Sequence, residues 1–121
     1  MSKRRLSGLK QDEVFVRHIL DEINFLMDKS KDLEYEGLIK DEILKRAFVR
    51  SLEVIGEATK NISLEFREKH PDIEWRQLTG LRDKLIHRYF GVKWEIVWDV
   101  KSKIPQLKEK IEDILEEMEK G

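Results

Sequence analysis

Positions 81–90 of the chain read LRDKLIHRYF, and neither Pro nor Gly interrupts them, so the local prediction is a helix. On a helix with 3.6 residues per turn, Arg82 and Tyr89 share one face, whereas His87 lies roughly 140° around the axis from Arg82. Asp83 precedes His87 by four residues, so its carboxylate can reach the imidazole and fix its tautomer. One helix therefore cannot point Arg82 and His87 at one small target, and a second copy related by a two-fold axis would complete the site.

Apolar residues recur at helical spacing before this stretch, and the chain is therefore predicted to be all-α. A first helix is predicted over Asp12–Ser30, followed by a polar link over Lys31–Gly37. A second helix is predicted over Asp41–Lys69, ending at His70-Pro71 because the residue before proline avoids helical dihedral angles. The predicted inner face of the first helix comprises Val16, Ile19, Leu20, Ile23, Leu26 and Met27. That of the second comprises Leu44, Ala47, Phe48, Ser51, Val54 or Ile55, Ala58, Ile62 and Phe66.

The second half of the chain is predicted to hold two more helices. A short turn at Glu74–Leu78 leads into the motif helix, Thr79–Phe90, with Gly91 as its C-cap. The last helix is predicted over Lys93–Glu119, and Pro105 is expected to kink or restart it. Its apolar residues alternate by three and four, like a heptad seam: Val97, Val100, Ile104, Leu107, Ile111, Ile114 and Met118.

These elements predict one domain over residues 1–121, an antiparallel four-helix up-and-down bundle with a short extra helical turn. The absence of cysteine excludes disulfides, a thiolate nucleophile and thiolate metal sites. The formal net charge is −1, so attraction to a nucleic acid would require a local basic patch. No apolar run approaches membrane-spanning length and no secretory hydrophobic region follows the start, so we expect a cytoplasmic protein.

Four segments, in order, carry a family resemblance that covers most of the chain. Arg82-x4-His87-x-Tyr89 matches the pattern RX4HXY, and RSLEVIGEA at 50–58 lies upstream of it. EWRQLTGL at 74–81 leads into the motif, while Val-Trp at 97–98 and IPQL at 104–107 follow it. The set resembles the HepT-type toxins of the HEPN superfamily, which are small helical ribonucleases. The resemblance implies a HEPN-like bundle and a metal-independent endoribonuclease that is the toxin of a toxin–antitoxin pair.

The resemblance also implies a role for each motif residue. Arg82 would neutralise the charge of a forming phosphorane, and His87 would act as general acid/base while the RNA's own 2′-hydroxyl is the nucleophile. Asp83 would support the site. Tyr89 would accept adenylyl groups from a cognate MNT-type nucleotidyltransferase antitoxin, and this AMPylation would block RNA with bulk and negative charge. Without the family context, these residues would be a solvated arginine, a partly buried histidine, a helix ion pair and a core-edge tyrosine.

Two other functions stay open: a non-catalytic HEPN module that binds a nucleotide or a nucleotidyltransferase, and a purely structural dimerisation domain. The expected partners are an RNA substrate, the MNT-type antitoxin and a second copy of the chain, with no membrane and no cofactor. His18 and His70 lack neighbours at metal-ligand spacing, so no metal site is expected. Trp75, Trp94 and Trp98 could stack on bases, although the pair four residues apart is more often core or dimer interface.

The segment Gly56-Glu57-Ala58 is predicted to lie against the motif helix, because its two small residues allow close helix approach. Glu57 is interpreted as an ion-pair partner of Arg82 or Arg50 rather than as a catalytic group.

Overall fold

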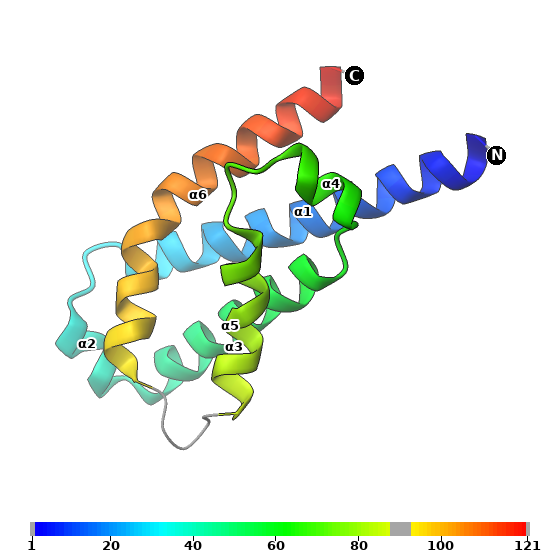
Figure 1. Cartoon of the computed structure of the whole chain (residues 1–121). Coiled ribbons are helices and arrows are strands. Elements are labelled where there is room, and N and C mark those ends of the chain that lie inside the picture. Colours follow the sequence, from blue (N-terminus) through cyan, green and yellow to red (C-terminus); the bar gives the residue numbers. More distant parts are fainter. Residues whose placement is uncertain (1, 88–92, 121) are drawn as a thin grey trace.

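Six helices make up the part of the chain that the structure describes (Figure 1). The structure, a computed structural model, describes residues 2–87 and 93–120, and for residues 2–10, 82 and 84–87 it describes the backbone alone. Over these residues there is no strand, which confirms the all-α bundle. Each of the four predicted helices corresponds to a long helix, but the second is divided in two, and a short helix begins in the predicted link before it. The elements are α1 (Ser2–Ser30), α2 (Tyr35–Lys40), α3 (Glu42–Lys60), α4 (Leu64–Lys69), α5 (Trp75–His87) and α6 (Trp94–Lys120).

Helix α3 is the centre of the bundle, because it packs against both α1 and α5. Helix α6 also packs along α1. Figure 1 shows that α1 and α3 run in opposite directions and that α6 returns beside α1. The predicted inner faces form one core, in which Ile55 is fully buried and Val54 is not. The most deeply buried apolar side chains are Val16, Ile19, Ile23, Leu38, Phe48, Ile55, Ile62 and Ile111. Across residues 2–87 and 93–120, no helix is long and apolar enough to cross a bilayer.

The single helix predicted over Asp41–Lys69 is wrong, because the chain leaves the helix after Lys60 and starts α4 at Leu64. Ser63 has extended dihedral angles and is the N-cap of α4, where its Oγ accepts a hydrogen bond from Phe66 N at 3.1 Å. Asp12 of α1 fixes the break, since its carboxylate accepts hydrogen bonds from Ser63 N and Oγ, both at 2.8 Å. The helix is thus divided by a contact with a distant residue, and it still ends before His70-Pro71 as predicted.

The predicted link over Lys31–Gly37 is also shorter than expected, because α2 begins at Tyr35. Leu38 anchors this short helix by full burial in the core. Asp41 then ends α2 and caps α3, where its Oδ1 accepts a hydrogen bond from Leu44 N at 2.9 Å. The start predicted for the second long helix is therefore confirmed by a capping contact.

Of the two terminal helices, α1 is longer than predicted and α6 has the predicted length. Helix α1 begins at Ser2 rather than at Asp12, and α6 matches its predicted bounds to within a residue. Pro105 lies inside α6 without interrupting it, and Figure 1 shows that the helix changes direction in its middle part. Proline removes one intrahelical hydrogen bond and crowds the preceding turn, so a bend is the expected outcome.

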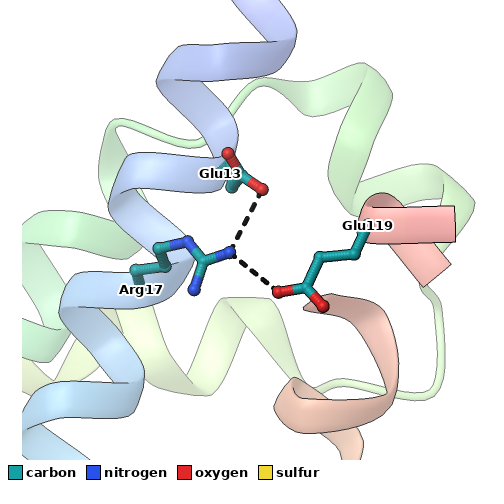
Figure 2. A network of polar contacts seen from close by, with 3 residues as sticks. All are labelled: Glu13, Arg17 and Glu119. Atoms are coloured by element: carbon teal, nitrogen blue, oxygen red, sulfur yellow. Dashed lines mark hydrogen bonds and ion pairs between the residues drawn. The ribbon is translucent and has the colours of Figure 1, made fainter. Parts of the chain in front are cut away.

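An ion-pair network joins the end of α6 to α1 (Figure 2). Arg17 Nη2 lies 3.4 Å from Glu13 Oε1 on its own helix and 3.2 Å from Glu119 Oε1 on α6. The bond to Glu119 and the charge of Glu13 raise the pKa of Arg17 further above its already high value, so the guanidinium stays charged. All three side chains are substantially exposed, and such pairs orient helices more than they stabilise them.

Candidate functional site

The first part of the motif falls on α5, which spans Trp75–His87 and so carries Arg82, Asp83 and His87 in its second half. The separate turn predicted at Glu74–Leu78 is wrong, because α5 already begins at Trp75, directly after Glu74. The carbonyl oxygen of Glu74 accepts hydrogen bonds from the backbone N–H groups of residues 77 and 78, at 3.1 and 3.2 Å. The predicted helix end at Phe90, the C-cap Gly91 and the modification site Tyr89 lie outside the described residues.

Trp75 anchors the start of α5 to the rest of the fold. Its side chain is buried, and its Nε1 donates a hydrogen bond to the carbonyl oxygen of His70 at 2.9 Å. Its ring also meets Phe66 of α4 edge to face, with the ring centroids 6.2 Å apart. Trp75 is therefore a core residue, and its suggested role in base stacking is wrong. The start of the motif helix is held by packing that does not depend on a ligand.

Asp83 forms an ion pair with a residue that the sequence did not single out. Lys60 Nζ, at the end of α3, donates a hydrogen bond to Asp83 Oδ1 at 2.9 Å. The two residues are 23 positions apart, so only the packing of α3 on α5 brings them together. The structure does not describe the side chains of Arg82 and His87, and their predicted assembly with Asp83 stays a prediction.

The segment Gly56-Glu57-Ala58 lies on α3, which packs on α5, and its two small residues are buried. Because Gly56 and Ala58 point roughly 160° apart around the helix axis, they cannot both face α5, and the predicted approach of this segment to the motif helix stays a prediction. Glu57 is exposed and lines a hollow of about 410 Å³ between α1 and α3. Arg50, also in this hollow, pairs with Glu53 at 3.5 Å. The hollow thus mixes both signs of charge, and the pairing predicted for Glu57 stays a prediction.

A second cavity, of about 350 Å³, opens between α5 and α6. Its floor is apolar and includes Ile55 of α3 together with Leu78 and Leu81 of α5. Asp83 follows Leu81 by two residues, which places it roughly 160° away around the helix axis. The cavity and the Lys60–Asp83 pair therefore occupy opposite faces of α5.

The two remaining tryptophans already have partners within the fold. Lys45 Nζ lies 5.2 Å from the ring centroid of Trp94, and Lys101 Nζ lies 4.0 Å from that of Trp98. Tyr35 of α2 meets Trp98 edge to face, and partial burial and the Glu95 carboxylate raise the pKa of its phenol. Both tryptophans pack against the core, which agrees with the structural interpretation of the pair.

Histidines outside the motif take part in aromatic packing. The His18 ring lies 6.0 Å from Phe15, and the His70 ring lies 4.7 Å from Phe66, measured between centroids. Within the described ranges, no three His, Cys, Asp or Glu side chains are grouped so that they could hold a metal ion.

Comparison with known proteins identifies the family. The family described as "Ribonuclease HepT-like" matches residues 19–114, which include the whole of α3 to α5. The chain belongs to the HepT-like family. A protein of Caldanaerobacter subterraneus subsp. tengcongensis named "Putative RNase" is 47% identical over 109 residues, covering 89% of this chain and 97% of that protein.

Other relatives of this HepT-like chain carry similar names. The "Probable ribonuclease HepT" of Thermococcus cleftensis is 40% identical over 101 residues, covering 83% of this chain and 92% of its own length. A further "Putative RNase", from Methanocaldococcus jannaschii, is 43% identical over 108 residues, covering 88% and 93% of the two chains. No solved structure matches the chain. The family predicted from the motif is therefore confirmed.

Proposed function

We propose that this HepT-like protein is the toxin of a toxin–antitoxin pair and acts in the cytoplasm as a metal-independent endoribonuclease. The observation that supports this most directly is the placement of Arg82 and His87 on one rigidly anchored helix of a HepT-like ribonuclease fold. An arginine can neutralise a phosphate, and a histidine can move protons near neutral pH. These two groups are sufficient for RNA cleavage in which the substrate supplies its own nucleophile.

In the proposed reaction, the ribose 2′-oxygen attacks the adjacent phosphorus and forms the O2′–P bond. His87 accepts the proton of the 2′-hydroxyl as general base. The P–O5′ bond then breaks, and the O5′ leaving group receives a proton from the imidazolium of His87. Arg82 stabilises the additional negative charge of the phosphorane. The products are a 2′,3′-cyclic phosphate and a 5′-hydroxyl end.

The proposed active form is a homodimer with composite sites. Arg82 and His87 are five residues apart on α5, roughly 140° around its axis, so one copy of the helix points them in different directions. A two-fold axis that sets two copies of α5 against each other would bring Arg82 of one copy toward His87 of the partner copy.

The proposed control is covalent modification of Tyr89 by an MNT-type nucleotidyltransferase antitoxin. The phenol oxygen attacks the α-phosphorus of ATP, the phenolic proton is lost, and pyrophosphate leaves. The resulting AMP group would place bulk and negative charge beside the residues that contact the RNA phosphate. Such neutralisation would persist after the antitoxin dissociates.

The test is cleavage of RNA by the purified protein and by His87→Ala and Arg82→Ala, with activity expected to fall on the order of 10²-fold or more in each. His18→Ala and Arg76→Ala are matched controls, because His18 lies on α1 and Arg76 is an exposed arginine in the first turn of α5. Cleavage should persist in a chelator and leave a cyclic phosphate. Full activity in His87→Ala, or loss of activity with the chelator, would overturn the mechanism.

A further inference from the structure

The contact between Lys60 and Asp83 places a charge pair beside the proposed RNA site. Lys60 is the last residue of α3, and Asp83 directly follows Arg82 on α5. Their side chains keep 34% and 59% of their surface exposed, with 2.9 Å between Nζ and Oδ1. The pair therefore lies at the protein surface, where a bound polyanion would experience both charges.

An acidic residue next to a phosphate-binding arginine poses an electrostatic problem. Successive Cα atoms are about 3.8 Å apart, so the Asp83 carboxylate lies within the Debye length, about 8–10 Å in physiological salt, of the Arg82 backbone. A carboxylate without a counter-charge there would repel the RNA backbone. The formal net charge of the chain is −1, so no excess of positive charge elsewhere compensates for this repulsion.

A role in stability alone is a weak explanation for the pair. Exposed ion pairs contribute little to folding, because water and salt screen them and both side chains lose conformational freedom. Trp75 already anchors the start of α5, and α3 and α5 pack against each other. The larger consequence of the pair is therefore the cancellation of the Asp83 charge.

We propose that Lys60 is a positioning residue of the RNA site, which holds and neutralises Asp83 so that the motif helix presents a favourable potential to the RNA phosphates. The inference rests on the proposed ribonuclease function and adds to it a residue of α3 outside the RX4HXY motif. Lys60 acts on substrate binding through Asp83, and the proton transfers are left to His87.

The experiment measures kcat and KM for one RNA oligonucleotide at low salt. Lys60→Met is expected to raise KM about 3- to 10-fold, with kcat changed less than about 2-fold. Lys60→Arg should keep the wild-type KM, because it retains the charge. In the Lys60→Met background, Asp83→Asn should restore KM even if it lowers kcat through His87. High salt should shrink the difference between wild type and Lys60→Met.

Lys69→Met is the matched control, because it removes one positive charge from an exposed ion pair within α4, with Glu65, that does not involve Asp83. An unchanged KM in Lys60→Met, or a rise that Asp83→Asn does not reverse, would overturn the role of Lys60 while the ribonuclease function stands. Absence of cleavage by the wild-type protein would instead overturn the proposed function. In that case the affinity for a non-cleavable 2′-O-methyl RNA tests the role of Lys60. Weaker binding by Lys60→Met than by wild type is expected, and equal affinities would overturn the role.

Discussion

Gly80 lies inside α5, two residues before Arg82, and a Cβ atom built there would lie in open space. Replacing it by alanine should stabilise the protein by about 0.5–1 kcal/mol, because glycine loses more backbone entropy than alanine when a helix forms. The measurement is chemical denaturation of wild type and Gly80→Ala.

Gly37 provides the control for this prediction. A Cβ there would come within 2.9 Å of Leu33 Cδ1, so Gly37→Ala should gain less stability or none. A loss of stability in Gly80→Ala would show that the surface around Gly80 is covered, as it would be in a dimer.

Tyr89 is the residue on which the proposed regulation depends. Co-expression with a cognate nucleotidyltransferase should increase the mass of the intact protein in steps of one AMP, with the modification mapped to Tyr89. Tyr89→Phe should stay unmodified and toxic in the presence of the antitoxin, whereas Tyr35→Phe should be modified normally, because Tyr35 packs on Trp98. Full neutralisation of an unmodified Tyr89 would favour simple occlusion by complex formation.

At the scale of elements, Asp12 decides where α3 ends and α4 begins. Its carboxylate is 5% exposed and accepts two hydrogen bonds from Ser63, the N-cap of α4. Asp12→Ala leaves both donors without this acceptor and should cost about 2–3 kcal/mol. Asp12→Asn keeps the shape and one acceptor, so it should cost less. Denaturant midpoints of the two variants measure the difference.

Glu13 is the neighbouring acid and the control for this prediction. It forms an exposed pair with Arg17, so Glu13→Ala should leave the midpoint nearly unchanged. Equal destabilisation by Glu13→Ala and Asp12→Ala would mean that the helix break does not depend on the buried carboxylate.

At the scale of the whole molecule, the proposed site requires two copies of the chain. Sedimentation should give twice the chain mass of 14.5 kDa at micromolar concentration. Mixing inactive Arg82→Ala and His87→Ala chains, with exchange of subunits, should recover part of the activity, because each mixed dimer contains one intact composite site. A monomer, or mixed dimers with no recovered activity, would contradict the composite site.

Much of this molecule was predictable from the sequence because its governing signals are local. Helical spacing of apolar residues identified α1, α3 and α6 and the residues of their inner faces, since burial of one stripe requires that period. The predicted helix start at Asp41 and the end before His70-Pro71, inferred from the geometry of proline, both match the structure. The motif of Arg82, His87 and Tyr89, together with three further segments in order, identified the family, because such patterns are properties of the chain order alone.

Other features depend on contacts between residues far apart in the chain, and only the tertiary structure decided them. Asp12 and Ser63 are 51 positions apart, and their hydrogen bonds divide a segment whose apolar spacing continues through the break. The short helix α2 begins within the segment predicted as a polar link, because Leu38 is buried in the core. Lys60 meets Asp83 because α3 packs on α5, although Asp83 has a histidine at helical spacing on its own helix. Periodicity fixes which face of a helix is buried, whereas the partner of each polar group depends on which helices lie side by side.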